Sequence, residues 1–532
     1  MFEFETGTAP RNKKEDEYGN GECTNICDRA AINHQAARER RPLMPPLCVM
    51  KFGGTSVGDA ACIARAAAIV KSAAAEGSVV VVVSAMSGVT NRLIDAAHRA
   101  EAGDASVITK LIGELREQHK KTLEALVRDA PKRAEVEKSL SEVLAELERL
   151  LQGTALLREL TPRALDSISG IGERLSTPLL AAAVNELGVP SVPVSATDVI
   201  VTDPHHGRAE PLMDHTRVRA EERLRPLLKK GIVPVVTGFI AATPDGVPTT
   251  LGRGGSDYSA TILGAALGAH ETVIWTDVDG VKTADPRIVP EARTIDEISY
   301  NEAAELAYYG AKVLHPNTLR PVTAAGVPVW IRNSFAPEKL GTKITARGNS
   351  NGGGVKALTA IRGVTMITVG GPGIVGLTDV LARSFAATAA LRANVLLVSQ
   401  SSSQNDICFV ISSADEKQTV EALRQAFAPE IAEQTVEHVS SNSGIAIVAV
   451  VGENMHGIPG VAGRTFSALG REGINISAIA QGSSEYNISL VVDANAMQRA
   501  MLTLHKEFRL NEPASAIQQP LSPGRATADR VS

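Results

Sequence analysis

A lysine and two glycines follow the first apolar run of the chain, in the stretch VMKFGGTSVGD at residues 49–59. The run LCVMKF predicts a strand and SVGDAACIARAAAIV predicts a helix, so Gly53 and Gly54 fall in a strand-to-helix turn. Glycines let the backbone approach an anion, and the start of a helix directs N–H groups toward it. Lys51 precedes the glycines, whereas the lysine of a Walker A loop follows them. The pattern indicates a phosphate-binding turn, with an ordinary capped helix start as the alternative.

A second polar turn ends another buried strand, in the stretch VVVVVSAMSGVTN. Ser84 and Thr90 lie at or just beyond the predicted carboxyl end of that strand. Ligands of open α/β folds bind at this edge of a parallel sheet, so these hydroxyls are candidates for substrate binding. A turn that is merely capped by serine or threonine is the alternative interpretation.

The most informative stretch is TTLGRGGSDYSA at residues 249–260. Arg253, Ser256 and Asp257 precede a helical run here, so a guanidinium that matches a carboxylate lies beside an anion-tolerant backbone. A purely structural glycine-rich turn rarely carries all three side chains. Glu173 follows a Gly-x-Gly turn in SISGIGERLSTPLL, where it either stabilises a helix start or, if buried, holds a substrate ammonium group.

Two later loops add aspartates and a lysine. The stretch IWTDVDGVKTADPR ends a predicted strand with Thr276 and Asp277, and its aspartates either serve magnesium or cap turns. The stretch GAKVLHP supplies Lys312, although a lone lysine there is more often a solvated surface charge. Together with Lys51 and Arg253, these loops gather cations, hydroxyls and carboxylates around helix starts, without an evident nucleophile.

This combination of groups favours direct phosphoryl transfer, in which the enzyme positions the reactants and neutralises oxygen charges. A carboxylate is a suitable acceptor because it is already ionised at neutral pH and needs no general base. Its repulsion from a triphosphate has to be screened, and lysine together with Mg²⁺ can do so.

Alternating apolar runs and helical stretches predict the elements that position these loops, from about residue 47 to residue 345. Runs such as SVVVVVSAM and GIVPVVTGFIA lack polar alternation, which suits strands that are buried on both faces of a mainly parallel sheet. Alternating strands and helices imply a layered α/β domain. The segment 106–152 reads as purely helical and predicts a helical hairpin packed on its own domain, with a partner-binding coiled coil as the alternative.

An internal repeat follows a glycine-rich stretch, ARGNSNGGGVKAL, that is typical of a linker. VLARSFAATAALRANVLLVSQ and VAGRTFSALGREGINISAIAQ begin at Val380 and Val461, and matching residues lie 81 positions apart. Gln400 and Gln481 are such a pair. Each unit predicts a strand, a helix and two further strands, that is, a small α+β unit used twice as a ligand sensor or dimer surface.

Composition excludes several classes of protein. The chain has 532 residues with 54 basic and 59 acidic side chains, which disfavours nucleic-acid binding. No apolar run suits a membrane span and the N-terminus does not resemble a secretory signal, so we expect a cytoplasmic location. Five cysteines make a disulfide framework improbable, and Cys23 with Cys27 predict free thiols rather than half of a metal site.

The motifs KFGGTSV, GERLS, TTLGRGGSDY, WTDVDGVKTADPR and GAKVLHP, in this order and followed by two ACT-type units, closely resemble those of aspartate kinase (aspartokinase). The resemblance covers about residues 48–510. It implies a three-layer amino-acid-kinase fold with a mostly parallel central sheet, followed by two α+β ACT domains. It also implies ATP-dependent phosphorylation of the side-chain carboxylate of L-aspartate, the opening step toward lysine, threonine, methionine and isoleucine, with Mg-ATP as co-substrate.

The divisions expected on this basis are a disordered extension (1–46), the kinase domain (47–345), a linker (346–358), two ACT domains (359–440 and 441–512) and a disordered tail (513–532). No dinucleotide-binding half follows the repeat, so we expect a monofunctional enzyme without homoserine dehydrogenase activity.

Residue roles follow from the resemblance, position by position. It makes Lys51, Arg253 and Asp257 catalytic. The residues expected around the amino acid are Ser84, Thr90, Glu173, Phe239, Arg253 and Ser256, with Arg253 on a carboxylate and Glu173 on the ammonium group. The residues expected on the nucleotide side are Lys51, Gly53, Gly54, Thr276, Asp277, Lys282, Arg287 and Lys312, and no protein-held metal is expected. Lys282 replaces the tyrosine usual in relatives, which leaves an aromatic contact near the nucleotide in question.

Control is expected through the repeat, in a homodimer or larger assembly formed by the ACT domains. Gln400 and Gln481 are candidates for binding an amino-acid effector, with backbone N–H groups near Gly373 and Gly460 taking its carboxylate. SQSSS and AQGSSEYNI are most similar to threonine-responsive relatives, so threonine is the expected inhibitor and lysine the alternative. Two other functions stay open: a kinase for glutamate, carbamate or a nucleoside monophosphate, and a non-catalytic ACT sensor on a kinase scaffold.

Overall fold

The structure is a computed structural model of the 532-residue chain, which divides into the units Met1–Pro45 and Pro46–Ser532. The fold below belongs to the second unit. No helix among the described residues has the length and hydrophobicity needed to cross a membrane. The described residues are 46–310, 314–348, 354–371, 377–400, 406–453, 455, 458–482 and 486–512.

The predicted kinase domain is built on an eight-stranded sheet with the order β3-β4-β2-β1-β7-β9-β10-β8. All neighbouring strands are parallel except β9 and β10, so the predicted mostly parallel sheet is confirmed. The central strands are buried on both faces, which explains why their sequences are apolar throughout. The strands are β1 (Leu47–Phe52), β2 (Ser78–Val83), β3 (Ser191–Val194), β4 (Val233–Thr237), β7 (Glu271–Thr276), β8 (Glu297–Ser299), β9 (Val329–Asn333) and β10 (Thr342–Thr345).

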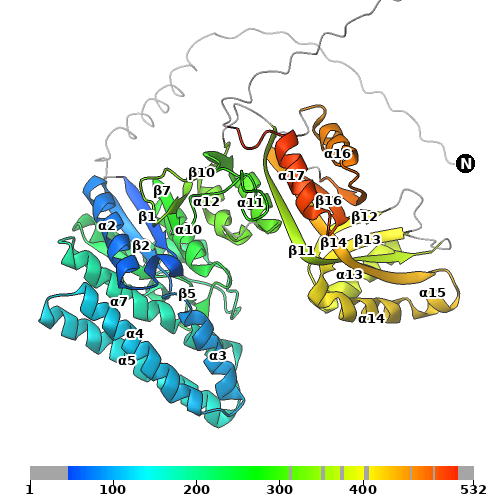
Figure 1. The fold of residues 1–532 in the computed structure, drawn as a ribbon. Coiled ribbons are helices and arrows are strands. Elements are labelled where there is room, and N and C mark those ends of the chain that lie inside the picture. Colours follow the sequence, from blue (N-terminus) through cyan, green and yellow to red (C-terminus); the bar gives the residue numbers. More distant parts are fainter. Residues whose placement is uncertain are drawn as a thin grey trace, which may run out of the picture. The chain divides into compact units, whose positions relative to one another are not determined.

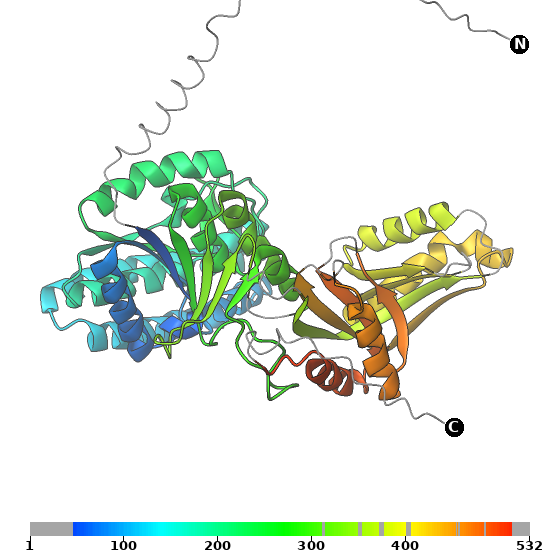
Figure 2. The same ribbon diagram turned by 90° about the horizontal axis from the view of Figure 1, so that it is seen from above.

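Helices cover both faces of this sheet and form two apolar cores (Figures 1 and 2). One core includes side chains of α2 (Ala60–Glu76), α3 (Val89–Glu101) and α7 (Ile171–Glu186). The other includes α8 (Met213–Arg223), α10 (Gly255–Leu267) and α12 (Arg320–Ala325). The remaining elements are η1 (Gly54–Val57), α6 (Pro162–Ser169), η2 (Ala196–Asp198), α9 (Arg225–Lys229), β5 (Ile240–Ala242), β6 (Pro248–Thr250), α11 (Tyr300–Tyr308) and η3 (Pro316–Leu319).

The segment predicted to be helical between residues 106 and 152 forms two helices, α4 (Ser106–Leu126) and α5 (Ala130–Leu157). Asp129 caps α5 by accepting a hydrogen bond from the N–H of Lys132. The two helices pack together, and α5 also contacts α3 and α7 of the same domain. Leu144 and Leu147 are therefore buried in the kinase core, and the predicted hairpin is confirmed.

The regulatory part is one continuous six-stranded antiparallel sheet with the order β12-β13-β11-β14-β16-β15, to which both repeat units contribute. The predicted linker 346–358 is too long, because residues 354–358 begin strand β11 and pair with β14. The first unit comprises β11 (Gly354–Gly370), α13 (Leu377–Ala390), β12 (Val395–Gln400), β13 (Asp406–Ser412), η4 (Ser413–Asp415), α14 (Glu416–Ala426) and α15 (Ala428–Ala432). The second comprises β14 (His438–Glu453), α16 (Val461–Arg471), β15 (Ile476–Ala480), β16 (Asn487–Asp493) and α17 (Met497–Glu507).

Both regulatory units contact the same loop of the kinase domain directly. The imidazole Nε2 of His505 on α17 lies 3.0 Å from the hydroxyl of Thr283, and both side chains are buried. The N–H of Leu358 on β11 donates to the carbonyl of the same threonine at 2.8 Å. Thr283 lies between Lys282 and Arg287, so the regulatory sheet touches the loop that carries predicted nucleotide-binding residues.

Candidate active site

A cavity of about 350 Å³ opens at the carboxyl ends of the parallel strands. Register explains its position, since Phe52 pairs with Val83 and Val83 pairs with Thr237, so that β1, β2 and β4 end side by side. Nine of the predicted site residues line it, from five segments of the chain. They are Lys51, Gly54, Ser84, Thr90, Glu173, Phe239, Arg253, Ser256 and Asp257.

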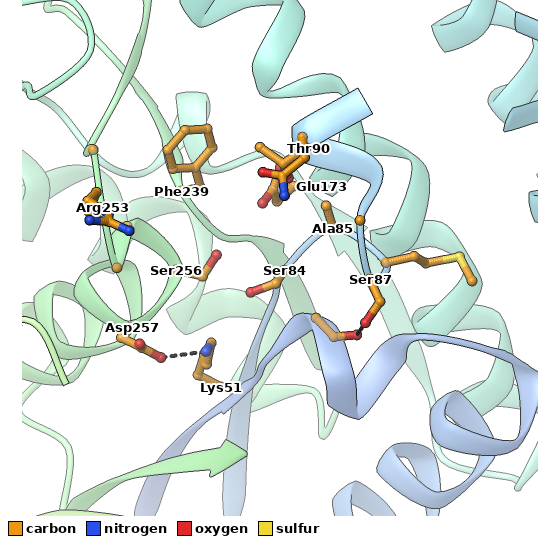
Figure 3. Close-up of a pocket in the computed structure, with 17 residues that line it drawn as sticks. Lys51, Ser84, Ala85, Ser87, Thr90, Glu173, Phe239, Arg253, Ser256 and Asp257 are labelled. Atoms are coloured by element: carbon orange, nitrogen blue, oxygen red, sulfur yellow. Dashed lines mark hydrogen bonds and ion pairs between the residues drawn. The ribbon is translucent and has the colours of Figure 1, made fainter. Parts of the chain in front are cut away.

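An ion pair lies at one side of the cavity (Figure 3). The ammonium Nζ of Lys51, at the end of β1, is 2.5 Å from the carboxylate Oδ1 of Asp257, in the first turn of α10. Both side chains are largely buried, with 10% and 16% of their surfaces exposed. Asp257 therefore holds the ammonium group in place beside the first backbone N–H groups of α10, where an anion would be attracted to both.

Phe239 is held in an unusual backbone conformation. Its φ angle is +67°, in the left-handed region that residues other than glycine rarely adopt. The hydroxyl of Ser259 accepts a hydrogen bond from the N–H of Phe239 at 3.0 Å, and the carbonyl of Phe239 accepts one from Leu251 at 2.9 Å. A Cβ atom on Gly255 would lie 2.6 Å from the phenyl ring, so glycine is required there. The turn TTLGRGGSDY and Phe239 thus form one interlocked wall of the cavity.

Glu173 is a buried carboxyl group on the other side of the cavity, and only 3% of its surface is exposed. Burial raises its pKa from 4.5 to about 8, although a backbone hydrogen bond from Ala85 and the charge of Lys51 act in the opposite direction. Its Oε2 atom has no hydrogen-bond partner among the described residues. A Cβ atom on Gly172 would lie 2.6 Å from the Cβ of Ala85, which explains the glycine just before this glutamate.

Arg253 lies across the cavity from Glu173 (Figure 3). The cavity therefore presents a cation at one side and a carboxyl group that can ionise at the other. Ser84 and Ser256 add hydroxyl groups between them. This arrangement suits a small zwitterion whose carboxylate meets the guanidinium and whose ammonium group meets Glu173.

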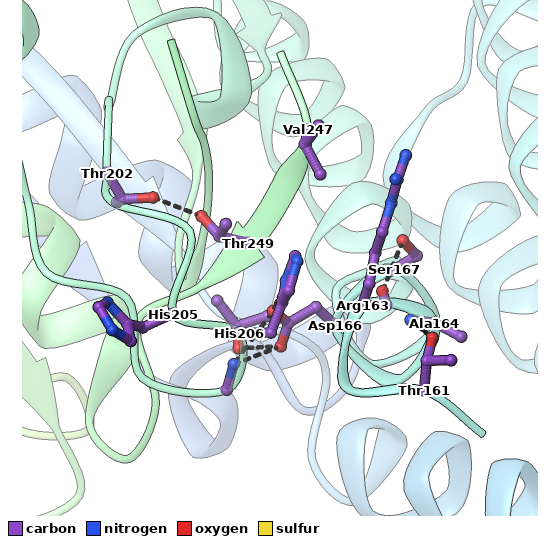
Figure 4. A network of polar contacts seen from close by, with 12 residues as sticks. Thr161, Arg163, Ala164, Asp166, Ser167, Thr202, His205, His206, Val247 and Thr249 are labelled. Carbon is purple, nitrogen blue, oxygen red and sulfur yellow. Dashed lines mark hydrogen bonds and ion pairs between the residues drawn. The ribbon is translucent and has the colours of Figure 1, made fainter. Parts of the chain in front are cut away.

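A buried aspartate that sequence reasoning did not select supports the turn that carries Arg253 (Figure 4). Asp166 on α6 accepts hydrogen bonds from the hydroxyl of Thr250 at 2.5 Å and from the N–H of Gly207 at 3.0 Å. The Nδ1 atom of His206 lies 2.8 Å from the same carboxylate. No local signal distinguishes Asp166 in the sequence, because its partners come from segments about 40 and 84 residues away.

The predicted nucleotide-side residues do not line this cavity, except Lys51 and Gly54. Gly53 donates its N–H to the carbonyl of Trp275 at 3.2 Å, which joins the first turn to the end of β7. Thr276 and Asp277 follow directly and are hydrogen-bonded to each other at 3.2 Å. Three predicted positions remain. The ammonium Nζ of Lys282 lies 3.5 Å from the hydroxyl of Thr294, and Arg287 is exposed and forms an ion pair with Asp285. Lys312 lies outside the described residues.

The predicted effector-binding residues lie at equivalent places in the two units. Gln400 ends β12 and Gln481 directly follows β15, and both side chains are exposed. Gly460 precedes α16 with a φ angle of +94°. Gly373, its predicted counterpart, lies outside the described residues.

Comparisons with known proteins agree with this geometry. Residues 46–333 match the amino acid kinase family, and residues 367–427 and 448–508 match an ACT domain. The chain is 34% identical to chloroplastic aspartokinase 1 of Arabidopsis thaliana over 476 residues, which cover 87% of this chain and 80% of the relative. The chain belongs to the aspartokinase family.

Solved aspartokinase structures share the fold. Escherichia coli aspartokinase III in complex with aspartate and ADP superimposes with a TM-score of 0.72 at 32% identity, covering 87% of this chain and all of that one. The same enzyme in complex with lysine and aspartate gives a TM-score of 0.70 at 32% identity and covers 86% of this chain and 99% of that one. The bifunctional aspartokinase/homoserine dehydrogenase 1 of Arabidopsis thaliana is 36% identical over 92% of this chain. The chain spans about half the length of such bifunctional relatives, 54% in this case.

Proposed function

We propose that this aspartokinase-family protein transfers the γ-phosphoryl group of ATP to the side-chain carboxylate of L-aspartate, which yields 4-phospho-L-aspartate and ADP. The observation that carries the proposal is the cavity with Arg253 and Glu173 on opposite sides and the Lys51–Asp257 pair between strand and helix ends. This chemistry needs no nucleophile from the protein, and none of the cavity-lining side chains is arranged as one.

Each charged group has a definite role in this proposal. Arg253 binds the α-carboxylate of the substrate. The carboxyl group of Glu173 loses its own proton and then binds the substrate ammonium group. The side-chain carboxylate then lies toward Lys51, which neutralises negative charge on the transferring phosphoryl group. Asp257 positions Lys51 through the 2.5 Å contact, and the first N–H groups of α10 point to the same region.

The nucleotide is proposed to bind beside this cavity, at the end of β7. Thr276 and Asp277 directly follow the carbonyl that holds Gly53, so phosphates bound there are adjacent to Lys51. Lys282, Arg287 and Lys312 complete the proposed nucleotide side. ATP enters as its magnesium complex, whose ion shares the charge of the phosphate oxygens.

Regulation by an amino acid is proposed for the ACT units, with threonine as the effector and lysine as the alternative. The lysine complex of the Escherichia coli enzyme supports the alternative. Gln400 and Gln481 are the proposed contacts, and the ACT units are also the proposed surface of a homodimer or larger assembly. A cytoplasmic location stays a prediction, because the plant relatives are named chloroplastic.

The test is an assay of ADP release with Mg-ATP and a panel of acceptors. We expect ADP release to depend on L-aspartate. The rate of ADP release with L-glutamate should be at least about tenfold lower. A second candidate, another kinase of the same fold, would be favoured by equal turnover with glutamate. No turnover with any acceptor would favour a non-catalytic sensor.

A further inference from the structure

Two buried serines tie the phosphate-binding turn to the end of β9. The hydroxyl of Ser56, in η1, lies 2.8 Å from the hydroxyl of Ser334, which directly follows β9. Each residue is only 2% exposed. The Ser56 hydroxyl also lies 3.4 Å from the backbone carbonyl of Trp275. None of the sequence motifs assigned to substrate or nucleotide binding includes Ser334, so its contact with the turn calls for an explanation.

Ser334 also holds the end of β7. Its backbone N–H donates to the carbonyl of Thr276 at 2.8 Å, and its hydroxyl donates to the same carbonyl at 3.1 Å. A serine hydroxyl has a single hydrogen, so the Ser334 oxygen accepts the hydrogen of Ser56. The bridge therefore runs from the turn after β1, through Ser334, to a residue that is proposed to bind the nucleotide.

Strand register explains why these groups meet. Phe52 at the end of β1 pairs with Trp275 of β7, and Thr276 at the end of β7 pairs with Asn333 at the end of β9. The three parallel strands therefore end side by side, with β7 in the middle. Ser334 is the first residue after β9, and its side chain reaches across the end of β7 to the turn beyond it.

The turn that Ser56 and Ser334 hold is in contact with the catalytic ammonium group. A Cβ atom on Gly53 would lie 3.2 Å from the Nζ atom of Lys51. A shift of the turn would therefore change the distance between the groups proposed to bind the phosphates, Lys51 on one side and Thr276 on the other. Small errors in such distances weaken binding and slow transfer, because the phosphates then cannot meet both sides at once.

We infer that Ser334 is a positioning residue for the nucleotide. It is buried and does not touch the nucleotide itself; it acts through Ser56, which fixes the phosphate-binding turn relative to Thr276. The inference rests on the proposed nucleotide side of the active site. It makes no use of the acceptor, so the amino-acid contacts of Arg253 and Glu173 should not depend on this bridge.

The inference is tested by calorimetric titration of the full chain with Mg-AMP-PNP, a non-hydrolysable analogue of ATP. Ser334→Ala should raise the Kd about two- to tenfold, the effect of roughly one lost hydrogen bond. Ser334→Thr keeps the hydroxyl and should retain the wild-type Kd. The matched control is Ser191→Ala at the start of β3, which removes a buried hydroxyl that donates to the carbonyl of Ala181 at 2.7 Å. It should lower the Tm similarly and leave the Kd unchanged.

A double-mutant cycle separates positioning from a general loss of stability. Ser56→Ala should raise the Kd about as much as Ser334→Ala, and the double variant no further than either, because all three break the same bond. In assays of aspartate-dependent ADP release, kcat/KM for Mg-ATP should fall about two- to tenfold in each variant, while the KM for aspartate stays at the wild-type value.

Three results would overturn the inference: a wild-type Kd in folded Ser334→Ala protein, an equal rise in the Kd of Ser191→Ala, or additive effects of Ser56→Ala and Ser334→Ala. If Ser334→Ala does not fold, a wild-type Kd in Ser56→Ala overturns it instead. A chain that shows the expected changes in Kd but does not phosphorylate aspartate would contradict the proposed function and support this inference, since the titration needs no acceptor.

Discussion

The kinase cavity and the regulatory sheet use their charged side chains in opposite ways. In the cavity, Lys51, Glu173 and Asp257 come from distant parts of the chain and each occurs once. Among the helices that belong to the regulatory sheet, the same contact occurs twice: Arg383 of α13 stacks over Phe427 at 4.5 Å, and Arg464 of α16 stacks over Phe508 at 4.7 Å. Substitutions in the cavity should therefore remove turnover. Substitutions in one regulatory unit should change the inhibition by an effector and leave the equivalent contact of the other unit in place.

The two regulatory units nevertheless contact the kinase domain differently. The second unit reaches the nucleotide-side loop through His505 and Thr283. The first unit reaches the same threonine through its backbone, since the N–H of Leu358 on β11 donates to the carbonyl of Thr283 at 2.8 Å. Sequence duplication has thus produced two similar units that contact one loop in different ways, the second through a buried side chain and the first through a backbone N–H.

The largest effect is expected in the cavity. Lys51→Ala should lower kcat by about 100-fold or more, because it removes a preorganised charge from the transition state. Effector binding, measured by calorimetry, should stay unchanged, since Lys51 lies in the kinase domain. A loss confined to the KM for aspartate or ATP would show that Lys51 only binds substrate.

Glu173 should make aspartate binding depend on pH. Its pKa of about 8 means that the free protein holds a proton there at neutral pH, which an ammonium group must displace. The KM for aspartate should therefore rise up to about tenfold per pH unit as the pH falls from 8 to 6. Glu173→Gln should bind aspartate weakly at every pH; a KM profile that matches the wild type would contradict this role.

The same group should affect stability in a defined pH window. The folded-state pKa of Glu173 is raised above the ordinary value of 4.5, so the folded protein binds one more proton than the unfolded chain between these values. This contribution is fully present below pH 4.5 and is lost as the pH rises to about 8, at up to about 1.4 kcal/mol per pH unit. Denaturant unfolding of wild type and Glu173→Gln at pH 5 and pH 8 measures it. Relative to the wild type, Glu173→Gln should have a higher free energy of unfolding at pH 8 than at pH 5.

Smaller effects are expected in the sheet. Gln400→Ala and Gln481→Ala should each retain the wild-type kcat. The substitution that lies in the unit that binds the effector should raise the concentration of threonine or lysine needed for half-inhibition about fivefold. That factor corresponds to roughly one hydrogen bond. Titration of both amino acids against the aspartate-dependent rate separates the two units. Wild-type inhibition in both variants would reject these glutamines as effector contacts.

The smallest effect is expected where the second unit meets the kinase domain. His505→Leu removes a buried hydrogen bond to Thr283, which should raise the KM for ATP by about two- to fivefold, with little change in the KM for aspartate. The matched control is Arg424→Leu, the equivalent position of α14 in the first unit, where the side chain is exposed. Equal effects of the two substitutions would argue against a special contact by the second unit.

Much of the catalytic half could be predicted from the sequence, because its groups lie at the ends of apolar strands. Lys51, Arg253 and Asp257 each follow or precede a recognisable run, and the parallel sheet brings such ends together. Asp166 could not be predicted, because its importance depends on partners from a loop and from β6. The positive φ angle of Phe239 is likewise set by Ser259 and Leu251, not by its own residue type.

The regulatory half was predicted as two units and forms one sheet. Repeat matching identified equivalent positions such as Arg383 and Arg464, but it carried no information on which strands pair between units. Residues 354–358 were predicted to be part of a flexible linker because they directly follow a glycine-rich run, yet pairing with β14 makes them a strand. Tertiary contacts override local composition here.

The most direct measurement of the central claim is chemical trapping of the product. The protein is incubated with Mg-ATP, L-aspartate and hydroxylamine, and the hydroxamate is identified by chromatography against the side-chain and α-carboxyl isomers of aspartyl hydroxamate. We expect the side-chain isomer, formed in amounts equal to the ADP released and at a rate lower by about 100-fold or more with Lys51→Ala. ADP release without the side-chain hydroxamate, or an equal yield of glutamyl hydroxamate from glutamate, would contradict the proposal.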